Sequence, residues 1–227
     1  MAISTAMSTS FKSELFSGGH CFNGTVAPTG SSASSTAYTA VSSMAGIAVG
    51  MSFTGTNVGA GSVVAAITSA TAFTSSVAAT GAISGGTLTF SGDTFNMALI
   101  KVSAGGTYGT ANVNYTDVTG NTDEVTGSGY TATGTALTNV TATTSGTTAW
   151  INFSPNPSWT GASFSTIGCM IYNGSSPRNG GTSGTNTTGA GRCCSVHDFG
   201  GTQTVSSGTF TVLMPTANQS LAILRIQ

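Results

Sequence analysis

Residues 93–105, DTFNMALIKVSAG, decide the fold class of this chain. In an extended strand successive side chains point to opposite faces of the sheet. Six apolar side chains alternate between the two faces here: Phe95, Met97 and Leu99 on one, Ala98, Ile100 and Val102 on the other. A strand that is apolar on both faces is typical of the middle of a packed sheet. This segment therefore predicts a central strand.

The sequence after this segment also has the features of β structure. Short runs rich in Thr, Val and aromatic residues alternate with turns that contain Gly, Asn or Ser, as expected for β structure. Further strands are predicted at 135–143, 148–154, 166–173, 192–200, 208–215 and 221–227. Many short strands without a second helix favour an all-β fold, a β-sandwich or jelly roll, over an α/β design.

The N-terminus differs from this pattern. Apolar residues recur every four positions and would form one face of a short amphipathic helix that ends at the SGGH sequence of residues 17–20. The apolar residues are Ile3, Met7, Phe11 and Leu15, with Phe16 beside them. Two interpretations stay open: this face contacts another protein or protomer, or it covers the chain's own sandwich.

Charge divides the chain into parts. Only 5% of its residues are charged and the net charge is -1, so no strong field attracts nucleic acid or an acidic membrane surface. No charged residue lies between Glu14 and Asp93. We therefore predict an N-terminal helical arm at 1–23, an inserted β domain at 24–92 and a main β-sandwich at 93–227.

The predicted insert has its own strand pattern. Strands are expected near 49–54, 62–68, 72–78 and 87–91, separated by turns that contain glycine, and residues 24–39 are expected to be a linker. The first residues of the chain show no basic leader, so no secretory signal is expected. No apolar stretch approaches the roughly 18 residues of a membrane span.

Two groups of residues invite a catalytic or metal-binding interpretation. Ser195, His197 and Asp198 suggest a nucleophile with a base and an acid, but a strand places Asp198 on the opposite face from the other two. The spacing typical of zinc ligands is absent among His20, Cys21 and the cysteines near His197. We expect all four cysteines, Cys21, Cys169, Cys193 and Cys194, to be small buried apolar residues rather than disulfides.

Carboxylates and glycines supply the remaining candidates. Asp117, Asp123 and Glu124 lie in a turn-rich stretch where calcium is conceivable, but their spacing matches no EF-hand, and a solvated loop is the preferred interpretation. Glu14, Asp93 and Asp198 are too scattered to assign as a glycosidase pair. The glycine-rich segment 175–192, with Arg178 and Arg192 near its ends, lacks the Lys-Ser/Thr of a phosphate loop and is predicted to be a mobile hairpin loop. We predict no enzyme activity and no cofactor.

Several ordered blocks of the chain nevertheless resemble a known group. Residues 1–22, 93–104, 124–176, 197–215 and 221–227 resemble small structural proteins of tailed bacteriophages. Within the predicted insert, residues 46–92 are similar to small β modules of phage fibres and bacterial surface proteins. The resemblance implies a virion component made in the bacterial cytoplasm, with no catalytic motif.

The function expected from the resemblance is that of a capsid decoration or cement protein. It would form a homo-oligomer, with a trimer favoured, and would bind the major capsid protein or other virion proteins, with no nucleic acid or membrane as partner. Two alternatives stay open. One is a tail fibre or adaptor, and the other is a glycan-binding module with an aromatic platform, for which the candidate residues are Trp150, Trp159, Tyr130 and Tyr172.

Overall fold

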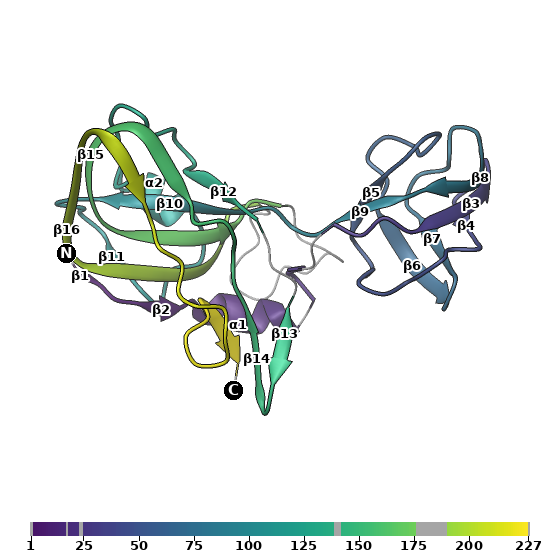
Figure 1. The fold of residues 1–227 in the computed structure, drawn as a ribbon, viewed down its shortest axis with the longest axis horizontal. Coiled ribbons are helices and arrows are strands. Elements are labelled where there is room, and N and C mark those ends of the chain that lie inside the picture. The colour runs from purple at the N-terminus through teal and green to yellow at the C-terminus, as the bar shows by residue number, and fades with distance from the viewer. Residues whose placement is uncertain (1, 17, 23–24, 139–141, 176–189, 227) are drawn as a thin grey trace. The chain divides into compact units, whose positions relative to one another are not determined.

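The computed structural model describes residues 2–226 except for 17, 23–24, 139–141 and 176–189. The chain forms two compact units (Figure 1). Unit 1 consists of Met1–His20 and Thr94–Gln227, and unit 2 consists of Cys21–Asp93. Of the N-terminal arm expected at 1–23, residues 1–20 belong to unit 1 and the rest belongs to unit 2.

Strands dominate both units, and the all-β class is confirmed. The strands of unit 1 are β1 (Ala2–Ile3), β2 (Ala6–Met7), β10 (Phe95–Lys101), β11 (Thr107–Tyr108), β12 (Thr135–Leu137), β13 (Thr143–Ser145), β14 (Thr148–Ile151), β15 (Ser158–Asn173), β16 (Arg192–Thr211) and β17 (Leu224–Ile226). Helix α1 (Thr9–Phe16) follows β2 in the chain. A single helical turn, α2 (Thr116–Thr119), was not expected.

The main sheet of unit 1 has the strand order β12-β10-β15-β16-β2 and is antiparallel throughout. As residues 93–105 predicted, β10 is paired on both sides and its residues from Met97 to Ile100 are buried on both faces. One face packs Ala98 and Ile100 with Met170 of β15 and Val196 of β16. On the opposite face Phe95 contacts Phe153, with ring centroids 5.8 Å apart.

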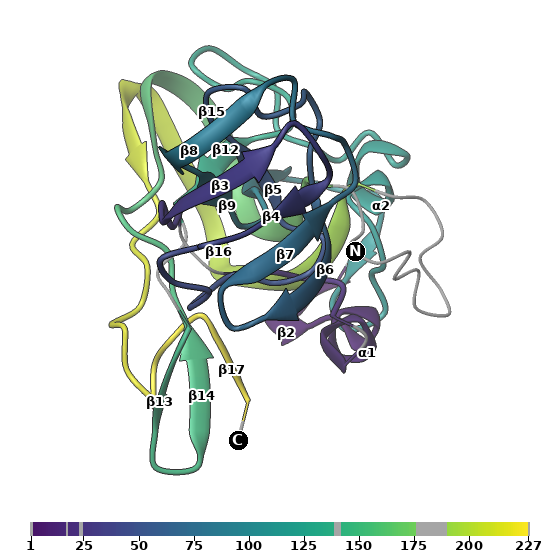
Figure 2. The same ribbon diagram turned by 90° about the vertical axis from the view of Figure 1, so that its right-hand side faces the viewer.

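Strands β15 and β16 form one long bent hairpin, which the sequence analysis divided incorrectly (Figures 1 and 2). The segments 192–200 and 208–215 were predicted to be separate strands, but 192–211 is continuous. Gly161 and Gly200, which resemble strand breaks in the sequence, have φ of 59° and 75°. Register irregularities lie along the hairpin, including one beside Gly161, between Trp159 and Ala162. They bend the ribbon without ending it.

The N-terminal helix is shorter than its periodicity predicted. Ile3 pairs with Tyr108 in a parallel β1–β11 ladder, and Met7 pairs with Ser195 at the edge of the main sheet. The prediction of a helix through these two residues was therefore wrong. Residues 2–3 and 6–7 form backbone pairs in sheets, and this pairing outweighs a four-residue apolar repeat that extended strands also accommodate.

Unit 2 contains β3 (Thr29–Ala33), β4 (Ala37–Tyr38), β5 (Ser52–Thr54), β6 (Val64–Ser69), β7 (Ala72–Ser75), β8 (Ala82–Thr87) and β9 (Thr89–Ser91). The linker expected at 24–39 was wrong, because it contributes β3 and β4. Its tyrosine, Tyr38, is fully buried and stacks on Phe73 with centroids 4.9 Å apart. Phe53 and Phe90 complete an aromatic core that is independent of the core of unit 1.

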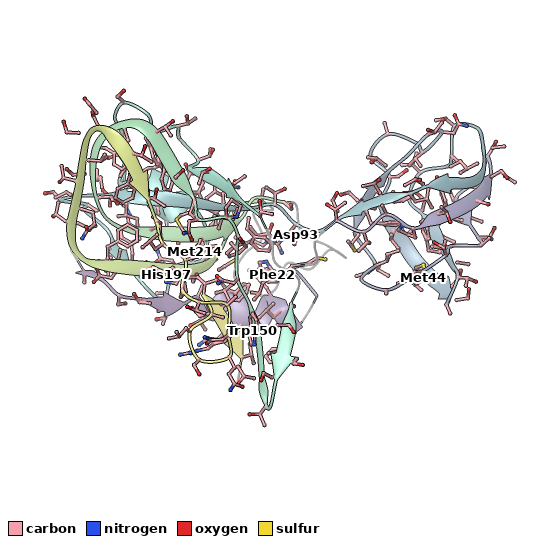
Figure 3. All side chains as sticks on the ribbon, in the orientation of Figure 1. Phe22, Met44, Asp93, Trp150, His197 and Met214 are labelled. Carbon is pink, nitrogen blue, oxygen red and sulfur yellow. The ribbon has the colours of Figure 1, made fainter. Side chains whose placement is uncertain are left out.

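The two ends of unit 2 are hydrogen-bonded to each other. The backbone N–H of Asp93 donates to the carbonyl of Cys21 over 2.8 Å, and the N–H of Cys21 donates to Asp93 Oδ2 over 2.8 Å. Asp93, labelled in Figure 3, is buried and is the single charged residue of this unit. Its carboxylate therefore has a structural role in closing the module.

Candidate functional site

The carboxylates that were candidates for calcium are used inside the protein. Asp123 is buried and accepts hydrogen bonds from the N–H groups of Gly105 and Gly106 and from Tyr108 Oη at 2.6 Å, so the expected solvated loop was wrong for this residue. Burial alone would raise the pKa of Asp123, but these hydrogen bonds lower it below its usual value. Asp117 instead accepts from the backbone N–H of Val113 at 2.8 Å.

Glu124 is the centre of a tyrosine network that the sequence analysis missed. Its carboxylate accepts hydrogen bonds from the hydroxyls of Tyr115 and Tyr130 and from the N–H of Thr133 at 2.8 Å. Tyr172 stacks on Tyr115 with centroids 4.5 Å apart. Burial, with Glu124 nearby, raises the pKa of Tyr172 to about 12 and raises the pKa of Tyr115 and Tyr130 as well. The arrangement holds the 130–134 loop against the sheet.

Metal ligands do not gather in the described residues. No group of three or more His, Cys, Asp or Glu side chains there is arranged to hold a metal ion. His20 instead lies 2.6 Å from Glu14 Oε2, with both side chains buried, and its Nδ1 lies 2.9 Å from Asn173 Nδ2. Beside them, buried Arg192 donates to the carbonyl of Gly19.

The Ser195, His197 and Asp198 segment lies within β16. Ser195 Oγ is 2.8 Å from His197 Nε2, which confirms that these two side chains share a face. The Asp198 carboxylate accepts from the N–H of Gly200 at 2.8 Å. Burial lowers the pKa of His197 to about 4, and Ser195 itself is 1% exposed. The Ser195 hydroxyl is therefore buried in the folded chain.

The cysteine prediction is confirmed. All four cysteines are free thiols and all are buried. Burial raises the pKa of Cys169 to about 12 and raises that of Cys193 as well. Such thiols are poor nucleophiles. The phosphate-loop candidate at 175–192 falls mainly on residues 176–189, which lie outside the described part, as does Arg178.

Three of the four proposed platform aromatics are packed against other residues. Trp159 and Tyr172 are buried, and Tyr130 stacks on Trp159 with centroids 6.1 Å apart. Trp150 differs, because it is half-buried in β14 of the small β13-β14-β17 sheet (Figure 3). That sheet extends from unit 1 in both ribbon views (Figures 1 and 2).

Exposed apolar side chains mark a candidate contact surface. Phe16, at the end of α1, is 94% exposed, whereas Phe11 of the same helix is 1% exposed and packs against His20. Of the five residues expected to contact a partner, Phe11 is therefore internal, and Ile3 packs against the core. Further exposed apolar residues of unit 1 lie in its C-terminal segment: Leu213, Leu221 and Ile226.

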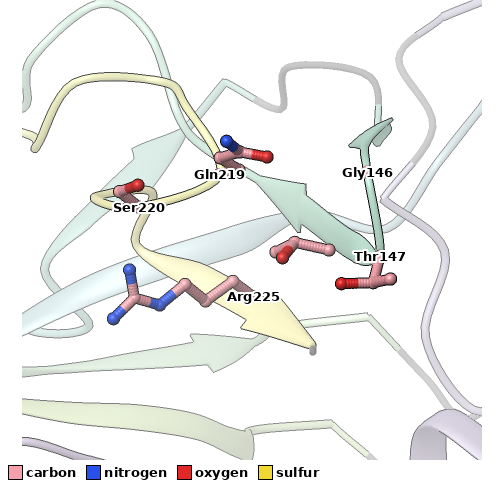
Figure 4. Close-up of a pocket in the computed structure, with 6 residues that line it drawn as sticks. Gly146, Thr147, Gln219, Ser220 and Arg225 are labelled. Atoms are coloured by element: carbon pink, nitrogen blue, oxygen red, sulfur yellow. The ribbon is translucent and has the colours of Figure 1, made fainter.

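A polar hollow of about 500 Å³ lies beside the small sheet (Figure 4). It is lined by Gly146, Thr147, Thr148, Gln219, Ser220 and Arg225. This site was not predicted from the sequence, where its signal is an isolated arginine in an otherwise uncharged C-terminal segment.

No helix in the described ranges is long and apolar enough to cross a membrane. Comparison of the chain with protein-family models, curated proteins and solved structures found no match.

Proposed function

We propose that the protein is a non-enzymatic structural component of a phage virion, and that it decorates the head by binding the major capsid protein. The observation that carries the proposal is the exposure of Phe16. Fully burying a phenylalanine side chain is worth about 1.5–3 kcal/mol, and this one is left in water by the isolated chain. A partner surface that covers Phe16 recovers this free energy.

The chemistry of unit 1 supports the same conclusion. Its buried carboxylates, Glu14 and Asp123, bind groups within the protein, and Ser195, which contacts His197, is buried. These contacts hold separate segments of the chain together. The low charge also suits a protein interface, because the centres of interfaces are depleted in charged residues.

A second copy of the chain is a further proposed partner, with a trimer as the favoured state. In unit 2, residues 65–69 of β6 are exposed, and among the described residues β7 is the only strand that pairs with this stretch. An uncharged edge strand is able to pair with another chain. The outer edge of β6 is therefore the proposed site of pairing between subunits.

Cosedimentation with capsids tests the decoration proposal. Purified chain is mixed with capsids of the encoding phage that lack it, and the pelleted fraction is measured for wild type, Phe16→Ser and, as a matched control, the exposed Lys12→Ser on the same helix. We expect saturable binding that Phe16→Ser weakens at least tenfold and Lys12→Ser leaves unchanged. Equal binding by all three, or none, contradicts the proposed contact.

A tail fibre or adaptor is the alternative within the virion, and it predicts few copies per particle.

Glycan binding is the second candidate function. One observation favours it: the polar hollow beside Trp150 and Arg225.

A further inference from the structure

We propose that the hollow in unit 1 binds an acidic saccharide, whose carboxylate is held by Arg225. This inference rests on the glycan-binding candidate, for which it names the ligand class, and does not depend on the assembly role proposed above. The hollow lies between the turn that joins β13 to β14 and the turn that precedes β17. Figure 4 shows Arg225 extending toward Ser220, with Gln219 above it and Thr147 to its right.

The position of the arginine is set by strand pairing. Arg225 is directly opposite Trp150 in the antiparallel β14–β17 ladder, so the two side chains share one face of the small sheet. Thr148 lies two residues from Trp150 along β14 and projects from the same face. Arg225, Trp150 and Thr148 thus share one face of the small sheet, on which Arg225 is exposed and Thr148 is buried.

The opposite wall is held by local hydrogen bonds. Asn218 Oδ1 accepts from the N–H groups of Ser220 and Leu221, at 2.9 and 2.8 Å, and the carbonyl of Asn218 accepts from the N–H of Ala222 at 3.0 Å. Gln219 Oε1 lies 3.8 Å from the point that a Cβ on Gly146 would occupy. The turn therefore presents Gln219 and Ser220 in a defined arrangement, which reduces the entropy lost on binding.

Charge identifies the ligand as an anion. Arg225 is exposed, and no carboxylate in the described ranges lies within ion-pair distance of it. Lys101, by contrast, lies 3.6 Å from Asp123. A guanidinium presents a planar set of N–H donors that matches a carboxylate with two parallel hydrogen bonds.

The remaining lining favours a sugar over an apolar acid. Small-molecule pockets are mostly apolar, with few polar groups. Here the walls carry the hydroxyls of Thr147, Thr148 and Ser220 and the amide of Gln219. Hydroxyl and amide groups both donate and accept hydrogen bonds, as the hydroxyls of a sugar ring require. A uronic acid unit supplies both the carboxylate and the hydroxyls.

Titration of the ¹⁵N-labelled full chain, followed by NMR, tests the proposal. The probes are trigalacturonate, the neutral galactotriose and inorganic phosphate, each at the same ionic strength. We expect trigalacturonate to shift the amide signals of Gly146, Thr147 and Ser220 saturably, and galactotriose to shift them much less. Absence of these shifts overturns the site. Equal shifts with phosphate overturn the saccharide assignment.

Variants test whether trigalacturonate binding depends on Arg225 itself or only on the positive charge of the protein. Arg225→Gln is expected to weaken trigalacturonate binding at least tenfold, and Arg225→Lys is expected to restore only part of it, because lysine lacks the planar set of donors. Gln219→Ala removes an amide from the rim and is expected to weaken binding severalfold. Lys12→Gln, an exposed charge on α1, serves as the control. Binding that falls equally in Lys12→Gln and Arg225→Gln contradicts a defined site.

Discussion

The hydroxyl of Tyr130 donates a 2.7 Å hydrogen bond to Glu124 Oε1 and accepts one of 3.0 Å from the N–H of Leu99 in β10. This relationship links the 130–134 loop both to β10, an inner strand of the main sheet, and to the Glu124 carboxylate. Hydrogen bonds to charged groups contribute about 1.5–3 kcal/mol each. The stability of unit 1 should therefore depend on the charge of Glu124.

Glu124→Gln keeps the shape of the side chain and removes the charge. We expect it to destabilise unit 1 by about 2–3 kcal/mol, because several hydrogen bonds to the carboxylate lose their ionic component. Urea unfolding monitored by tryptophan fluorescence measures the change. Asp198→Asn, at an exposed carboxylate, is the control and is expected to change stability by less than about 0.5 kcal/mol. Equal unfolding midpoints for the two variants would show that the network is dispensable.

His197 should make stability depend on pH. Its pKa in the folded chain is about 4, below the ordinary value of 6.5, so the unfolded chain binds the proton more readily. The contribution of neutral His197 is complete above pH 6.5, falls as pH decreases toward 4, and is worth at most about 3 kcal/mol.

The variant His197→Gln isolates this effect. Glutamine keeps a polar partner for Ser195 Oγ but does not titrate. Unfolding free energies are compared at pH 7 and pH 4.5, and we expect the wild type to lose more stability over this interval than the variant. Equal losses would mean that His197 titrates normally in the folded chain.

The cysteines should be inert until the chain unfolds. Burial raises the pKa of Cys169 to about 12, so almost no thiolate forms at pH 8, and all four thiols are covered. Ellman's reagent should react slowly with the native protein and label four thiols per chain in concentrated urea. Rapid labelling of the native protein would contradict the packing of β15 and β16.

The two phenylalanines of α1 should behave oppositely. Phe11 is 1% exposed, and Phe11→Ala should cost about 3–5 kcal/mol of folding free energy. Phe16 is 94% exposed, and Phe16→Ala should change stability by less than about 0.5 kcal/mol. Thermal unfolding distinguishes the two. A large loss in Phe16→Ala would mean that this side chain supports the fold and is not reserved for a partner.

The sequence predicted the elements whose pattern of apolar residues depends only on neighbouring positions in the chain. The run from Phe95 to Ile100 is mostly apolar on both faces wherever it is placed, so its position between two other strands of a buried sheet followed directly. Ile3 and Met7 were assigned wrongly, because their spacing suits a helix and the competing strand partners, Tyr108 and Ser195, are far away in the chain. Tertiary pairing of this kind leaves no local pattern.

The candidate sites were harder to predict than the strands for the same reason. Glu124 lies in a stretch that reads as a loop, and its partner Tyr130 is recognised only when the loop folds back on β10. Arg225 and Gln219 line one hollow because two turns meet beside the small sheet. Neither arrangement has a spacing motif, since each depends on contacts between separate turns.

The amount of this protein in purified virions of the encoding phage tests the central claim most directly. Quantitative mass spectrometry gives its copy number relative to the major capsid protein. The decoration role predicts a ratio near parity or a simple fraction set by lattice symmetry. A few copies per particle would place the protein in the tail, and its absence from the particle would contradict a virion role.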